Sequence, residues 1–200
     1  MQSATQVNYS FLFCRFEAME DNNFTTANHY LNSTKAEFKK LKALGDKTFA
    51  QLSTVTEFNY KPNEEANSIA TIIQHLSGNM ISRWTDFLTT DGEKPTRDRD
   101  TEFEERNLNK EQLLLIWENG WTVLSNSLNT LNADDIMKQV TIRGEKHTVI
   151  QAINRQLTHY AYHIGQIIYI TKYIKSADWQ TLSIARNKSK EFNQKMADRT

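Results

Sequence analysis

Apolar residues recur three or four positions apart in four long stretches of the chain, which is the spacing of helices that bury one face. In the second stretch, for example, Ile72, Leu76 and Met80 fall on one side of a helix. The four stretches are residues 26–52, 64–88, 110–131 and 149–175. Amphipathic helices of this length bury their apolar stripes by packing on one another at a small angle. The pattern therefore predicts an all-α fold class, with a four-helix bundle as its architecture.

Three connecting segments separate these helices. "NYKPNEEANS" ends the first helix, with Pro62 as the break and Asn63 as the predicted N-cap of the second helix. "TTDGEKPTRDRD" is a polar loop. "VTIRGEKHTV" alternates in polarity and predicts a short hairpin, with its turn at Arg143-Gly144 or Gly144-Glu145.

The chain of 200 residues is long enough for one sizeable core, so a single domain is expected. Residues 1–22 lack helical periodicity and are interpreted as an N-terminal extension. The domain itself is predicted to cover residues 23–200, including a polar C-terminal tail.

Composition limits the classes of partner. Lys plus Arg and Asp plus Glu number 24 each, so there is no electrostatic reason to expect nucleic acid or an anionic membrane as partner. The one cysteine, Cys14, allows no internal disulfide and no cysteine-based metal site, which fits a reducing compartment. No stretch approaches the roughly 18 apolar residues of a membrane span. We predict a cytoplasmic protein.

The chemistry in the sequence is concentrated in "QLTHYAYHIGQIIYI". His159 and His163 stand four apart, so they lie roughly 40° apart around a helix and both imidazoles can reach one point in space. His75 occupies a similar position at the edge of the apolar stripe of the second helix. Two interpretations follow: a metal site shared between helices, or three histidines that face solvent beside the core.

Several enzyme classes are excluded by their motifs. Tyr160 stands where a zinc protease would carry its glutamate base. The nucleophile elbow, the phosphate-binding loop, the dinucleotide fingerprint and the paired Glu-x-x-His motifs of di-iron bundles are all missing from the sequence. His29 and His147 lie in polar segments and are interpreted as surface histidines.

Three motifs together resemble the DinB/YfiT-like superfamily of metal-dependent enzymes, and most of all a branch known only as a domain of unknown function. They are His-Leu-x-x-Asn beginning at His75, Arg-Trp-Thr-Asp-Phe-Leu beginning at Arg83, and His-Tyr-x-x-His beginning at His159. The resemblance covers about residues 26–192. It implies a bundle in up-down-down-up order, with a long crossover between the second and third helices.

The resemblance also implies a site. One divalent metal is expected on His75, His159 and His163. Asn79 lies one turn from His75, and Tyr162 lies beside the other two histidines, so their positions predict supporting roles: Asn79 to orient a ligand or bind substrate, and Tyr162 to donate a proton or a hydrogen bond. Three neutral imidazoles leave an open coordination position, as in catalytic sites, and do not select strongly among nickel, zinc, iron and manganese. The implied activity is transfer of a low-molecular-weight thiol to a small-molecule substrate, in a protein that forms a homodimer. A metal-dependent hydrolase and a non-catalytic metal-binding or interaction bundle stay open as alternatives.

Overall fold

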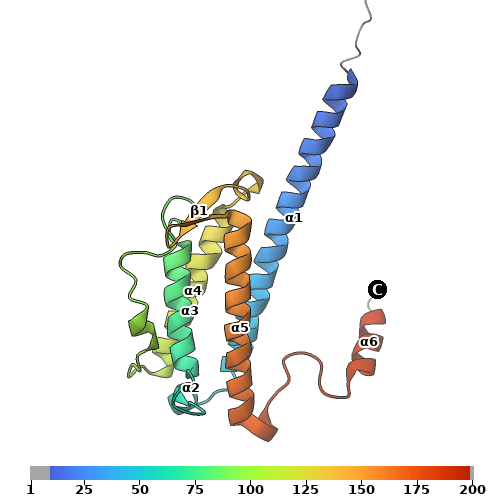
Figure 1. The fold of residues 1–200 in the computed structure, drawn as a ribbon. Coiled ribbons are helices and arrows are strands. Elements are labelled where there is room, and N and C mark those ends of the chain that lie inside the picture. Colours follow the sequence, from blue (N-terminus) through green and yellow to red (C-terminus); the bar gives the residue numbers. More distant parts are fainter. Residues whose placement is uncertain (1–9, 199–200) are drawn as a thin grey trace, which may run out of the picture.

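The computed structural model describes the backbone of residues 10–198 and the side chains of residues 26–198. Four long helices dominate it (Figure 1): α1 (Ser10–Phe49), α3 (Ile69–Trp84), α4 (Lys110–Thr130) and α5 (Val149–Lys175). Helix α3 packs on α4 and α5, while α1 packs on α5 and α4. The predicted all-α class is confirmed, because the strands among residues 10–198 form one small hairpin.

The third and fourth predicted helices agree with α4 and α5 because both begin at clear caps. The Asn109 side chain accepts a hydrogen bond from the Gln112 amide, and the Gln112 side chain accepts one from the Asn109 amide. Thr148 and Gln151 form the same reciprocal capping box at the start of α5. Such caps satisfy backbone N–H groups that the first turn of a helix leaves unpaired.

The first two helices begin elsewhere than predicted. Helix α1 starts at Ser10, so part of the expected extension continues this helix, while residues 1–9 lie outside the described residues. The prediction of Asn63 as N-cap is wrong. Asn63 closes a turn by accepting from the Ala66 amide, and Ser68 caps α3 by accepting from the Thr71 amide.

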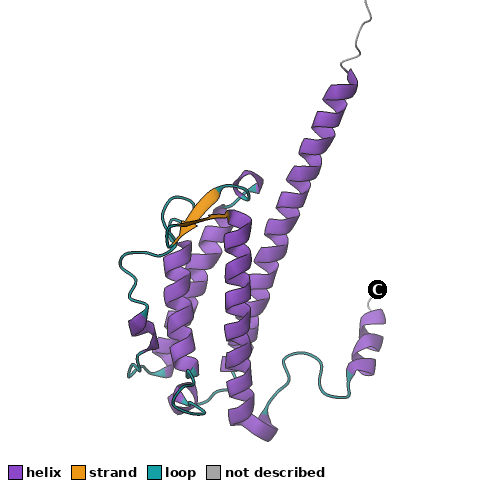
Figure 2. Ribbon diagram, in the orientation of Figure 1, coloured by secondary structure: helices purple, strands orange, loops and turns teal. Residues whose placement is uncertain are grey.

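The predicted hairpin is confirmed. Strand β1 (Gln139–Ile142) pairs antiparallel with β2 (Glu145–Thr148), and Ile142 lies opposite Glu145. The turn is therefore Arg143-Gly144, and both residues have positive φ, 56° and 76°. This two-residue turn matches the twist of the strands. Figure 2 shows the hairpin beside the end of α5 at which that helix begins, while α1 extends well past it.

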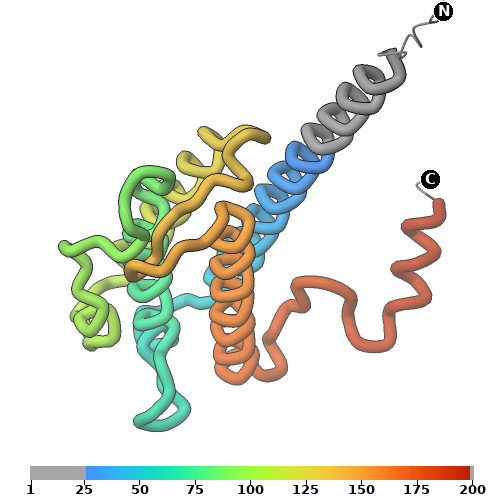
Figure 3. Tube along the Cα trace, turned by 45° about the horizontal axis from the view of Figure 1, so that its top comes forward, coloured from blue at the N-terminus to red at the C-terminus, as the bar shows by residue number. Residues whose placement is uncertain are grey.

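The remaining elements are short. They are α2 (Val55–Asn59), η1 (Asp100–Phe103), η2 (Ala133–Asp135), η3 (Ser176–Asp178) and α6 (Ser189–Ala197). Helix α6 lies away from the four long helices in both views (Figures 1 and 3). In the part of the chain that the structure describes, no helix is both long enough and apolar enough to cross a lipid bilayer.

Helix α3 is the centre of the core. The sequence predicts a stripe on one side of it, yet nearly every residue from Ile69 to Trp84 is buried, including the polar Gln74 and Ser77. The reason is that α2, α4, α5 and η1 all pack against α3. Residues 85–109, named here the crossover segment, contribute η1 to this cover. A polar residue on α3 is therefore placed in the interior, where it requires a partner.

Two helical glycines make opposite contributions to stability. A Cβ on Gly120 would lie 2.8 Å from the Ser77 Cα, because α3 and α4 approach closely there. We expect Gly120→Ala to destabilise the protein by about 1–3 kcal/mol, since the backbones must separate. A Cβ on Gly165 in α5 would meet nothing within 4 Å, so Gly165→Ala should stabilise by up to about 1 kcal/mol. Urea unfolding of both variants measures this, and equal shifts of the midpoint would contradict the packing of α4 on α3.

Candidate metal centre

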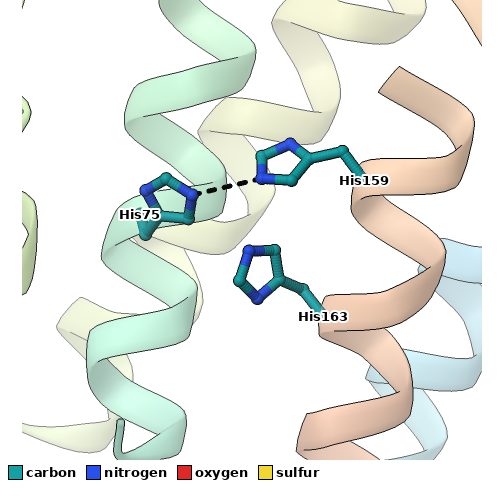
Figure 4. A group of neighbouring side chains, drawn as sticks. All are labelled: His75, His159 and His163. Carbon is teal, nitrogen blue, oxygen red and sulfur yellow. Dashed lines mark hydrogen bonds between the residues drawn. The ribbon is translucent and has the colours of Figure 1, made fainter. Parts of the chain in front are cut away.

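The three predicted histidines come together in one cluster. His75 lies in the middle of α3, and His159 and His163 lie one turn apart on the facing side of α5 (Figure 4). One ring nitrogen of each lies within 4.8 Å of those of the other two. His75 Nε2 and His159 Nε2 lie 3.2 Å apart. His75 and His163 are buried and His159 is partly buried, so the alternative of three solvent-facing histidines is wrong.

The second ring nitrogen of His75 is held by a carboxylate. His75 Nδ1 lies 2.9 Å from Glu102 Oε2, and both side chains are buried. A carboxylate only accepts hydrogen bonds, so Nδ1 carries a proton, and in the neutral ring the lone pair is then on Nε2. The neutral form of His75 therefore presents its Nε2 lone pair toward the cluster. Phe103, the next residue of η1, lies against the same imidazole with 4.8 Å between ring centroids.

His163 is oriented in a similar way from its own helix. Its Nδ1 lies 2.8 Å from the side-chain oxygen of Gln166, one turn further along α5. Its Nε2 is directed between the other two rings (Figure 4), where it is buried and has no hydrogen-bond partner among the described residues. A buried polar atom without a partner costs about 1–3 kcal/mol, and in a native structure it calls for an explanation such as a bound ion.

Two of the three imidazoles are kept in the neutral form, which donates a lone pair. Burial, followed by the neighbouring imidazoles of His163 and His75, lowers the pKa of His159 to about 3. Burial also lowers the pKa of His163 to about 4, although the hydrogen bond to Gln166 opposes the shift. At pH 7 both imidazoles are therefore neutral, as metal ligation requires.

These observations fit a divalent metal ion. Three neutral imidazoles are a common donor set for such ions, and the unpartnered Nε2 of His163 supplies a lone pair aimed at the cluster. Two nitrogens bound to one tetrahedral zinc ion would be about 3.3 Å apart. The 3.2 Å between His75 Nε2 and His159 Nε2 is close to that value.

Of the two predicted supporting residues, Tyr162 lies beside the histidines and Asn79 lies in the core. The ring of Tyr162 lies beside the cluster, with its centroid 4.2 Å from that of His163, and its side chain is half exposed. Asn79 is buried, and its side-chain oxygen accepts a hydrogen bond from the Tyr160 hydroxyl at 3.0 Å. Asn79 therefore ties α3 to α5 in the core, whereas Tyr162 lies where the cluster meets solvent.

Sequence patterns gave no sign of Glu102, Phe103 or Gln166. Glu102 and Phe103 belong to the crossover segment, which reads as an ordinary polar loop with no helical or strand periodicity. The one local signal is Asp98, whose side chain accepts from the amides of Asp100 and Thr101 and starts the η1 turn. Such a turn predicts local order, but not which side chain of the turn meets α3.

A cavity of about 550 Å³ lies next to the centre, between α3, α4 and the crossover segment. Its lining includes Gly78, Arg97 and Glu102, together with Asn119 from α4. The three histidines are not part of this lining. Glu102 therefore has the cavity on one side and the imidazole of His75 on the other.

Comparison with known proteins identifies a family. The model of a family described as "Protein of unknown function (DUF1572)" matches residues 25–188. The matched region contains all three histidines, the crossover segment and the hairpin. A search of the curated proteins found no match. The expected likeness to a domain of unknown function is confirmed, and the wider DinB/YfiT-like relationship stays a prediction.

Proposed function

Because the chain belongs to the DUF1572 family and brings three imidazoles to one point, we propose that it is an enzyme that depends on one divalent metal ion. His75, His159 and His163 are the proposed ligands. The observation that carries the proposal is the buried Nε2 of His163, which has no partner among the described residues. A purely structural histidine in the interior normally finds a hydrogen bond for each polar nitrogen.

We further propose the up-down-down-up bundle of the DinB/YfiT-like superfamily as the detailed architecture. The long crossover segment between α3 and α4 supports it, because such a connection lets two neighbouring helices run in the same direction. The packing of α3 on both α4 and α5 also supports it. In this arrangement α1 and α5 run in one direction, and α3 and α4 run in the other. The proposed ligands come from one helix of each pair, α3 and α5.

Two side chains of the protein orient the proposed ligands. Glu102 and Gln166 fix the ring orientations of His75 and His163 through their second nitrogens. A divalent ion held by three imidazoles would supply Lewis acidity and keep a coordination position open for a thiol or a substrate. The half-exposed ring of Tyr162 borders the side from which a small molecule would enter.

The proposed reaction is transfer of a low-molecular-weight thiol to a small-molecule substrate. Such thiols are kept reduced in the cytoplasm, which is where we place the protein. We include a homodimer in the proposal. The exposed rings of Tyr169 and Tyr173 along α5 support it, because aromatic side chains are enriched at protein interfaces.

Metal and thiol binding test this function in two steps. Protein prepared without a histidine tag should retain about one equivalent of zinc, nickel, iron or manganese, measured by mass spectrometry of the elements. A panel of cellular thiols should then raise the melting temperature of the metal-bound protein, since a ligand of the folded state stabilises it. Metal far below one equivalent, even after incubation with each ion, would overturn the metal centre. Stoichiometric metal without stabilisation by any thiol would overturn thiol transfer and leave hydrolysis or a non-catalytic role.

A further inference from the structure

The crossover segment contacts the metal centre through a chain of three buried, charged or polar side chains. Arg97 donates to both oxygens of Glu102, from Nε at 2.7 Å and from Nη2 at 2.8 Å. Glu102 in turn accepts from His75 Nδ1 at 2.9 Å. The side chains of these three residues are 5%, 8% and 6% exposed. The two-point contact fixes the plane of the carboxylate, which one hydrogen bond would leave free to rotate.

The backbone of α3 is adapted to this carboxylate. Gly78 follows His75 by one turn, and a Cβ at this position would lie 2.2 Å from Glu102 Oε1 and 2.7 Å from Glu102 Cδ. Glycine in the middle of a helix costs about 0.5–1 kcal/mol relative to alanine. Nothing about α3 as a helix favours a glycine here, whereas the position of Glu102 requires one.

Arg97 links Glu102 to a second carboxylate of the crossover segment. The Arg97 guanidinium also lies 3.4 Å from Glu93, which binds Arg83 on α3 at 2.9 Å. The crossover segment is thus fastened to α3 at two places, and Glu102 is held on His75 from outside.

We propose that Glu102 is a positioning residue for the metal centre, held in place by Arg97, and that it fixes His75 in the tautomer with its proton on Nδ1. In this tautomer the Nε2 lone pair is available at the point where the three imidazoles meet. A free imidazole exchanges between two tautomers, and only one of them can ligate through Nε2. A carboxylate on the outer nitrogen also makes the inner nitrogen a stronger base. The crossover segment is in this sense part of the metal centre.

The test measures the tautomer and the metal affinity separately. Nitrogen–proton correlation spectra of the histidine rings in the metal-free protein report which nitrogen of His75 carries the proton. Zinc affinity is measured by competition with a chromogenic chelator. In Glu102→Ala we expect His75 to populate both tautomers and zinc affinity to fall about 10–100-fold. Glu102→Gln keeps an oxygen that accepts from Nδ1, so it should keep the wild-type tautomer and lose less affinity.

Two further variants keep the test decisive. Arg97→Gln leaves Glu102 in place but frees its carboxylate to rotate, so affinity should fall while His75 retains a partner. Glu105→Gln is the matched control, because Glu105 is an exposed carboxylate of the same segment, paired with Lys61. It should change neither measurement.

The outcomes separate this inference, which rests on the proposed function, from that function itself. If Glu102→Ala and Arg97→Gln keep both the tautomer and the affinity of the wild type, the positioning role is overturned. If the wild type binds no zinc, the metal centre fails, yet a change of the His75 tautomer in Glu102→Ala still supports the positioning role. If Glu105→Gln lowers affinity as much as Glu102→Ala does, the effect belongs to the segment's net charge and the proposal is overturned.

Discussion

Replacing His163 with leucine should abolish tight metal binding and leave the metal-free protein at least as stable as the wild type. The two effects have different causes. Loss of one of three imidazoles should lower affinity by at least about 100-fold, since even loss of a residue that only supports a ligand costs about 10–100-fold. Without metal, the buried Nε2 of His163 has no partner among the described residues, so leucine removes a polar atom that costs about 1–3 kcal/mol.

This combination is measured by two unfolding curves for each protein. With a chelator present, His163→Leu should unfold at the same or a higher urea concentration than the wild type. With zinc in excess, the wild type should gain stability and the variant should not, because an ion that binds only the folded state stabilises it. His29→Leu is the control, since His29 is an exposed histidine on α1. A variant that is less stable than the wild type in chelator would show that His163 serves the fold rather than a ligand.

Much of the helical framework could be predicted because local signals mark it. The hydrophobic spacing predicts where the helices lie. The capping-box residues at Asn109 and Thr148 mark the first residues of α4 and α5. The start of α3 was misplaced because Asn63 and Ser68 are both good cap residues. Only the observed backbone shows that the first closes a turn and the second begins the helix.

The histidine cluster could be predicted only in part. Helical spacing brings His159 and His163 together, and it placed His75 on another helix without saying which helix faces which. The burial of His75 depends on η1, which packs against α3, and the local turn signal at Asp98 does not predict that contact. Sequence patterns could not predict Glu102 as the partner of His75, because the two residues are 27 positions apart in the chain.

The core around Trp84 links the fold to the metal centre. Trp84 is 2% exposed, and its ring packs against Phe38 of α1 and against Phe87. Its Nε1 donates to the Tyr160 hydroxyl at 3.1 Å, and that hydroxyl donates to the Asn79 oxygen at 3.0 Å. This chain of hydrogen bonds joins α3 to α5, the two helices that carry the histidines. Tyr160 is also the direct neighbour of His159.

We expect Trp84→Ala to destabilise the protein by about 3–5 kcal/mol, the range for removing a large aromatic side chain from a core. That is a large share of the 5–15 kcal/mol that stabilise a typical domain. The variant should also bind zinc more weakly, since α3 and α5 are no longer held at one separation. Urea unfolding with chelator measures the first effect, and chelator competition measures the second.

Trp179→Ala is the matched control. Trp179 follows η3 after the end of α5 and is only partly buried, so its loss should cost less than about 1 kcal/mol and leave zinc affinity unchanged. Tyr160→Phe refines the result by removing only the hydroxyl. Trp84 Nε1 and the Asn79 oxygen then lose their partner in the core, which should cost about 1–3 kcal/mol. A Trp84→Ala variant that unfolds at the same urea concentration as Trp179→Ala would contradict the packing of α1, α3 and α5 around this ring.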